Sequence, residues 1–163
     1  MIQVEVFNSF PVGADWDELF VASVEAGELT MVDFFLKNGA DINTSAGLAL
    51  NYASLHGDLK LVKYLVEKGA NINIEPFVAT PLSEAVQGGH LEVVKYLVEK
   101  GANVNANNKQ ALKYAIALNN LEIVKYLAEH GADFYSNNNW GLRFSEEINS
   151  RKAIIDYLRS SAK

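Results

Sequence analysis

The chain has 163 residues, of which 49% are apolar and 21% charged, a composition that predicts one folded domain and excludes disorder as its main state. Fourteen lysines and arginines stand against 20 aspartates and glutamates, and the resulting formal charge of −6 argues against general binding to nucleic acid. The absence of cysteine excludes disulfides, thiolate catalysis and thiolate zinc sites. It favours a cytoplasmic location, in the source cell or after delivery into a host cytoplasm.

Residues 1–14 form an N-terminal extension that does not share the pattern of the rest of the chain. The alternation in IQVEVF predicts a short strand there. The extension lacks the basic start and apolar run of a signal peptide, and nowhere do about 18 apolar residues run unbroken. We therefore expect neither secretion by that route nor any membrane-spanning segment.

Internal repetition dominates the remaining chain, and it decides the architecture. Four segments align without gaps. They read GELTMVDFFLKNGADIN (27–43), GDLKLVKYLVEKGANIN (57–73), GHLEVVKYLVEKGANVN (89–105) and NNLEIVKYLAEHGADFY (119–135). Each segment is one copy of a repeated unit of about 30 residues.

Each copy predicts a helix with one buried stripe, such as Val94, Leu97 and Val98 in the third. The glycine that follows each helix suits a left-handed cap. N-cap positions hold Asp58, His90 and Asn120, and the caps after the helices are Gly39, Gly69, Gly101 and Gly131.

A shorter helix precedes each of these, in DELFVASVEAG, LALNYASLHG, TPLSEAVQGG and QALKYAIALNN. Gly57, Gly89 and Asn119 are predicted to close the turn between the two helices, since Asn tolerates positive φ better than other residues with side chains. The last segment, WGLRFSEEINSRKAIIDYLRSSAK, predicts a polar capping repeat with one extra residue, in which Ser150 takes the place of Gly89.

Side chains that recur on the exposed part of the second helices also suggest structure rather than chemistry. Lysines four residues before glutamates predict surface ion pairs, and aromatic residues at 34, 64, 96 and 126 predict packing between units. The pairs are Lys63 with Glu67, Lys95 with Glu99 and Lys125 with Glu129.

Thr80, Pro81 and Leu82, followed by GHLEVVKYLVEKGANVN, resemble the ankyrin-repeat family over about residues 15–160. The resemblance implies an all-α ankyrin-repeat α-solenoid of about five helix-turn-helix units with short β-turn fingers, capping terminal repeats and a monomeric state. The other units lack the Thr-Pro pair, so we expect less rigid turns there. The domain would cover 15–163, with units 15–43, 44–73, 74–105, 106–135 and 136–163.

No constellation in the sequence predicts an active site, a cofactor or a metal. The histidines His90 and His130 occupy a turn and a helix end, and no phosphate-binding glycine loop is present. His56 has two interpretations: a solvated turn residue, or a contact tuned by protonation.

The resemblance also implies where a partner protein would bind. The two residues before each helix turn would line a concave groove, with apolar Leu55 and Leu118 at its centre and acidic Glu25 and Glu147 at its ends. Large apolar residues in the fingers have two interpretations, as interface anchors or as packing against the next unit. The candidate partner-binding residues are Glu25, Leu55, His56, Ile74, Phe77, Val78, Gln87, Lys109, Ala117, Leu118, Tyr135, Trp140 and Glu147.

We therefore expect a non-catalytic protein-binding module that acts as a blocking inhibitor or immunity-type protein. An adaptor or host-directed effector that bridges two proteins is the main alternative. Three further alternatives are an acidic mimic of nucleic acid, an enzyme without a recognisable motif and a stack with no partner. Neither nucleic acid nor a membrane is an expected partner.

Overall fold

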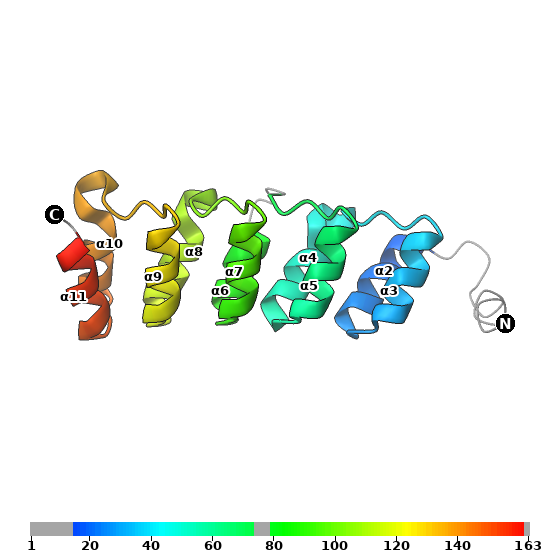
Figure 1. Cartoon of the computed structure of the whole chain (residues 1–163), viewed down its shortest axis with the longest axis horizontal. Helices are drawn as coiled ribbons and strands as arrows, with labels where there is room; N and C mark the ends of the chain where they lie inside the picture. The colour runs from blue at the N-terminus through cyan, green and yellow to red at the C-terminus, as the bar shows by residue number, and fades with distance from the viewer. Residues whose placement is uncertain (1–14, 74–78, 162–163) are drawn as a thin grey trace.

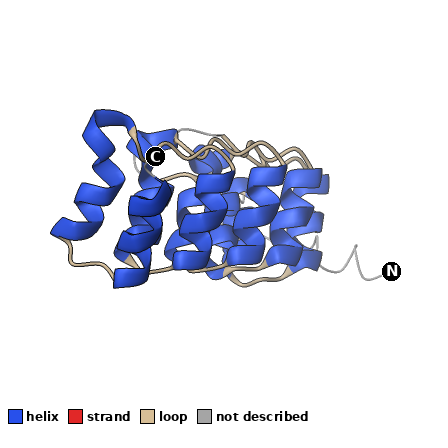
Figure 2. Ribbon diagram, turned by 60° about the vertical axis from the view of Figure 1, so that its left-hand side comes forward, coloured by secondary structure: helices blue, strands red, loops and turns tan. Residues whose placement is uncertain are grey.

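The computed structural model describes residues 15–73 and 79–161, and within these ranges it contains ten helices and no strand. The helices form five pairs that stand side by side, with the loops between pairs along one edge and the turns within pairs along the other (Figure 1, Figure 2). The expected all-α repeat architecture is confirmed. The strand predicted in IQVEVF and the candidates Ile74, Phe77 and Val78 lie outside the described residues.

The pairs build two layers of helices. Consecutive first helices contact one another, as do consecutive second helices from α5 onward. The first helices are α2 (Trp16–Glu25), α4 (Thr44–His56), α6 (Pro81–Gln87), α8 (Ala106–Ala117) and α10 (Ser136–Glu147). The second helices are α3 (Leu29–Lys37), α5 (Leu59–Glu67), α7 (Leu91–Glu99), α9 (Leu121–Glu129) and α11 (Lys152–Ser161).

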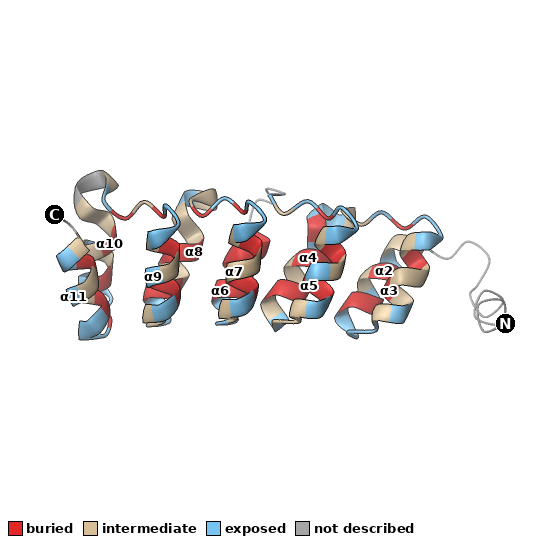
Figure 3. Ribbon diagram, in the orientation of Figure 1, coloured by how far each residue is buried: buried red, intermediate tan, exposed pale blue. Residues whose placement is uncertain are grey.

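The core runs the length of the stack between the two layers (Figure 3). Each second helix contributes the stripe that its periodicity predicts, for example Val93, Val94 and Leu97 in α7, which are 1% exposed or less. Ala53 and Ala85 are also buried on the first helices, where their small side chains let the two layers approach closely.

The turns within pairs use the left-handed residues that the sequence predicts. Gly57 and Gly89 have φ of 73° and 75°, and Asn119 fills the same place with φ 56°. The Asn119 side chain adds a bond across the stack, because its Oδ1 accepts the amide of Arg151 at 2.6 Å. The asparagine therefore serves both as a turn residue and as a link to the last pair.

The last pair differs from prediction at its turn. Asn149, with φ 55°, takes the place of Gly89, and the amide of Ser150 bonds the carbonyl of Ser145 as that of His90 bonds Ala85. The expected equivalence of Ser150 with the glycine is therefore wrong. The extra residue comes after the turn and delays the start of α11.

The three central first helices, α4, α6 and α8, begin in two different ways. Where Thr-Pro is present, α6 starts with a capping box, in which the Thr80 and Ser83 side chains each bond the other residue's backbone amide. Where the pair is missing, α4 and α8 are entered through three consecutive left-handed residues, 45–47 and 107–109. The regular helix therefore begins only at residue 48 in α4 and residue 110 in α8.

Asparagine side chains join the loops of neighbouring pairs. The Asn73 Oδ1 accepts the amide of Asn103 at 2.9 Å, and its Nδ2 donates to the carbonyl of Gly101 at 2.9 Å. Asn105 repeats both bonds one unit later, to Asp133 and Gly131. These bonds hold the repeats in a fixed register.

The outer face of the second helices does not carry the predicted ion pairs. Lys95 pairs with Glu92 at 2.8 Å rather than with Glu99, and Lys63 lies over the Tyr96 ring of the next pair, 5.6 Å from its centroid. Lysine before glutamate is the less favourable order for an i,i+4 pair, whereas the neighbouring ring offers a cation–π contact. The tyrosines pack between units as predicted.

Candidate functional site

Corresponding positions of the first helices lie on one side of the stack, which we call the groove face; of these positions, Thr80 and Ser83 are buried. Counting back two, five, six and nine residues from the left-handed turn residue selects the same helical stripe in each unit. In order of helix, its members are Glu18, Val21, Ala22 and Glu25; Leu48, Asn51, Tyr52 and Leu55; Thr80, Ser83, Glu84 and Gln87; Gln110, Lys113, Tyr114 and Ala117; Trp140, Arg143, Phe144 and Glu147.

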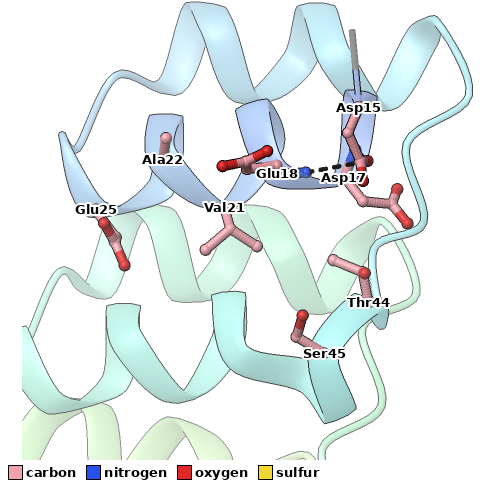
Figure 4. A pocket seen from close by; sticks show the side chains of 8 residues that line it. All are labelled: Asp15, Asp17, Glu18, Val21, Ala22, Glu25, Thr44 and Ser45. Carbon is pink, nitrogen blue, oxygen red and sulfur yellow. Dashed lines mark hydrogen bonds between the residues drawn. The ribbon is translucent and has the colours of Figure 1, made fainter. Parts of the chain in front are cut away.

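The α2 end of the groove face is a hollow of about 460 Å³ with carboxylates around it. Figure 4 shows Glu18, Val21 and Glu25 projecting from α2, with Thr44 and Ser45 opposite at the start of α4. Asp15, Asp17 and Ala22 complete its lining. The expected acidic end at Glu25 is thus part of a larger acidic surface.

Two of these carboxylates have structural roles. Asp15 caps α2 by accepting the amides of residues 17 and 18, and Asp17 accepts the amide of Asp41 at 2.6 Å. Glu18 and Glu25 make no ion pair or side-chain hydrogen bond with another described residue. Their charges therefore face solvent.

The next part of the groove face is an apolar notch of about 270 Å³ between α4 and α6. Leu48, Tyr52, Leu55 and Ala79 line it, and Glu84 lies at its edge. Burial raises the pKa of the Glu84 carboxyl above its ordinary value. Leu55, an expected groove residue, is half-buried in this notch rather than fully exposed.

The C-terminal part of the groove face carries positive charge. Lys109 and Lys113 lie over the Trp140 ring, with their Nζ atoms 5.4 and 5.9 Å from its centroid. Arg143 is exposed on the next helix. Glu147 is exposed at the end of α10, and the neighbouring cations make this end mixed in charge rather than acidic.

The residues just before the turns are mostly exposed. Leu118 is 54% exposed and Ile148 39% exposed, which are large fractions for apolar side chains. The smaller or polar residues Gln87 and Ala117 are exposed beside them. A row of accessible groups follows the turn edge of the groove face.

The His56 ring lies on the rim of this row and is held by its own helix. It stacks on Tyr52 with a centroid separation of 4.2 Å, and its Nδ1 lies 3.0 Å from the Tyr52 carbonyl oxygen. A carbonyl oxygen only accepts, so Nδ1 is the protonated nitrogen in this arrangement. The other ring nitrogen is left for solvent or a partner.

Two aromatic candidates expected in the last finger are tied to the C-terminal pair. Trp140 lies inside α10, and its indole nitrogen donates to the Asp133 carbonyl at 2.8 Å. Tyr135 is 44% exposed, and its hydroxyl donates to the carbonyl of Ser161. Both side chains therefore hold α10 and α11 in place.

His90 occupies the N-cap position of α7 that the sequence predicts, but its side chain bonds across the stack. Its Nε2 lies 3.0 Å from the Leu55 carbonyl, and its side chain makes no capping bond. A Cβ added at Gly88 would lie 2.3 Å from that same carbonyl and 2.5 Å from the His90 ring. Glycine at position 88 is therefore required for this close contact between α4 and α6.

The described part of the chain offers no group of three metal-binding side chains. No helix among these residues is long and apolar enough to cross a membrane.

Sequence reasoning missed Leu48 and the change of charge along the groove face. Leu48 is 39% exposed and lies nine residues before its turn. The resemblance assigns only the two residues before each turn to the groove, so it leaves this position out. The signal was present in the sequence, since aligning the first helices by their turn residues already places Glu18, Leu48 and Lys113 on one stripe.

Comparison with known proteins agrees with the repeat architecture. The family model described as "Ankyrin repeats (3 copies)" matches residues 5–76 and 74–138, which is more than half of the chain. No curated protein matches the chain. Repeats of this family are generally protein–protein interaction modules and typically not catalytic. The chain belongs to the ankyrin-repeat family.

Proposed function

We propose that the chain is a non-catalytic module that binds one partner protein through the groove face and the fingers and blocks that partner. The observation that carries the proposal is the placement of exposed apolar side chains. Leu48, Leu118 and Ile148 are 39%, 54% and 39% exposed, and all three belong to the first helices or the turns that follow them. Leu118 and Ile148 occupy the same position, directly before the turn residue, in neighbouring units. Exposed apolar groups in a polar surround are typical of an interface.

Steric blocking is supported by the rigidity of the stack. The asparagine bonds between loops and the continuous core fix the repeats before any partner arrives. A surface that is already ordered loses little conformational entropy on association. One extended face suits one partner, whereas an adaptor needs a second face, and the outer surface of the second helices carries solvated lysines and glutamates.

The test is a comparison of capture from cell extract by the wild-type chain and by two variants. Leu118→Glu should abolish retention of the partner or weaken it by about 30-fold, the loss expected for an interface hot spot of roughly 2 kcal/mol. Ala153→Glu on α11, another exposed apolar residue, is the matched control and should retain it. Equal retention by both variants would contradict a role for the turn edge of the groove face, where Leu118 lies.

The captured protein then separates the two modes of action. A blocking protein should abolish the partner's own activity at one-to-one stoichiometry. An adaptor should leave that activity intact and bring down a second protein in a ternary complex. The second result would exclude the inhibitor interpretation while leaving the binding function in place.

A further inference from the structure

The first helices of the stack are divided by charge. The helices α2, α4 and α6 contain four acidic residues and neither lysine nor arginine, whereas α8 and α10 contain three cations and only two acidic residues, Glu146 and Glu147. The acidic residues are Asp17, Glu18, Glu25 and Glu84, and the cations are Lys109, Lys113 and Arg143. All other described lysines and arginines lie on or beside the second helices.

The apolar notch and the acidic hollow adjoin each other within the acidic half. Ser45 lines both cavities, so a ligand in one is next to the other. The notch walls are mostly the side chains of Leu48, Tyr52, Leu55 and Ala79, and Asn51 adds one amide. One occupant therefore meets apolar walls and uncompensated carboxylates within a short stretch of surface.

Charge complementarity selects the chemistry of that occupant. Neither Glu18 nor Glu25 forms an ion pair with a described residue. Glu84, which lines the notch, forms none with these residues either. Acidic groups on a partner would be repelled here, whereas lysine or arginine side chains would supply the missing charge. At the other end Lys109 is paired with Asp133, and Lys113 and Arg143 share the surface with Glu146 and Glu147. That end is therefore mixed in charge and attracts a basic segment less than α2 does.

Building on the proposed function, we propose that the groove face receives a basic amphipathic segment of the partner. Its cationic side chains lie against α2, and one of its large apolar side chains enters the notch between α4 and α6. Two steps between packed helices span roughly 16–20 Å. A helix of about 12 residues, at 1.5 Å per residue, would cover that distance.

The first experiment selects ligands from a phage-displayed library of random 16-residue peptides on the full chain. Selected sequences are remade as synthetic peptides and measured against wild type, Leu48→Glu and Leu118→Glu. We expect the peptides that Leu48→Glu weakens by about tenfold or more to carry an excess of lysine and arginine and at least one large apolar residue.

Two other outcomes are distinct. Peptides that depend on Leu48 but are neutral or acidic would overturn the proposed partner chemistry and leave groove binding intact. Failure to recover any peptide that depends on Leu48 or Leu118 would overturn both the inference and the proposed function. Circular dichroism of each variant confirms that a loss of binding is not a loss of fold.

A charge exchange then tests where the basic residues lie. The double variant Glu18→Lys/Glu25→Lys should bind the best basic peptide about tenfold more weakly or worse. A peptide whose lysines are replaced by glutamates should bind this variant better than it binds wild type. Asp15 and Asp17 are left unchanged because their carboxylates bond backbone amides.

The matched control is Glu67→Lys/Glu99→Lys, which changes the net charge equally on the exposed outer face. It should change binding less than twofold at physiological salt, because screening limits the reach of distant charges to about 8 Å. Equal losses in the two double variants would overturn the assignment of the basic residues to α2.

Discussion

Asp133 shows how a single carboxylate holds the last pair of helices to the stack. Its Oδ2 accepts Lys109 Nζ at 2.7 Å, and its Oδ1 accepts the amides of Tyr135 and Ser136 at 3.1 and 2.9 Å. The Lys109 ammonium, with further help from Ser136, holds the pKa of Asp133 well below its ordinary value of 3.8. The charged form is thus the one that the fold stabilises.

This shift predicts acid sensitivity at the C-terminal end. Because the folded-state pKa is depressed, the contribution of Asp133 is fully present above the unfolded value of about 3.9 and is lost as pH falls through the folded value. Hydrogen exchange of α10 amides, corrected for intrinsic rates, should lose protection between about pH 4 and pH 2 in wild type.

Asp133→Asn is the informative comparison, because the amide keeps the acceptor oxygen and loses the charge. The variant should show weaker protection of α10 at pH 7 and a smaller change on acidification. An unaltered pH profile in Asp133→Asn would show that other carboxylates cause the acid response.

The entry to the first helices differs between elements for a steric reason. Thr80 and Pro81 supply a cap and a fixed φ at the start of α6, whereas α4 begins after Ser45, Ala46 and Gly47, with φ of 50°, 56° and 75°. A left-handed conformation costs a residue with a Cβ roughly 1–2 kcal/mol, and glycine avoids that cost. The α4 entry is therefore a strained element, and its strain lies beside the acidic hollow.

Replacing Ala46 with glycine should relieve this strain. After subtracting the larger backbone entropy of glycine in the unfolded chain, Ala46→Gly should raise the free energy of unfolding by roughly 0.5–1 kcal/mol. Urea denaturation followed by circular dichroism measures the difference. Ala153→Gly, in the right-handed α11, should lower the same free energy by up to about 1 kcal/mol; a decrease in both variants would mean that Ala46 is not strained.

At the scale of the whole molecule, the stack is built from contacts between neighbours only, so its ends are the weakest places. The pair α10–α11 has a neighbour on one side, and it packs on α8 and α9 less extensively than α6 packs on α4 and α8. The ion pair between Arg159 and Glu146 adds little to the stability of this pair of helices, because both side chains are exposed to solvent.

We expect unfolding to begin with this C-terminal pair. Native-state hydrogen exchange should show α10 and α11 opening at a lower free energy than α6 and α7, whose residues are buried from both sides. Leu97→Ala, in the centre of the stack, should cost about 2–5 kcal/mol and lower protection throughout. Equal protection of terminal and central helices would instead indicate one cooperative unit.

Local patterns in the sequence predicted the fold well, because each depends on one turn of helix or one loop. The caps Gly101 and Asn119, the buried stripe of α7 and the packing of the tyrosines between units all agree with the structure. The prediction of an ion pair between Lys63 and Glu67 was wrong, because Lys63 lies over the Tyr96 ring. That ring belongs to the next unit, so the pattern within one repeat does not reveal the contact. The prediction that Ser150 is the turn residue was wrong. Alignment of the repeats shows that one residue is inserted but not whether it comes before or after the turn residue.

The candidate site depended more on tertiary structure. The sequence by itself determined the repeat, the two helices per unit, the core stripes and the family, since hydrophobic spacing and turn residues act locally. Only the tertiary structure decided that Glu18, Leu48 and Glu84 border adjoining cavities, and that Trp140 is held by Asp133. The residues around the cavities are about 30 positions apart in the sequence, and stacking of the repeats brings them onto one surface. The bond of Trp140 to Asp133 depends on a side-chain rotamer, which the sequence does not specify.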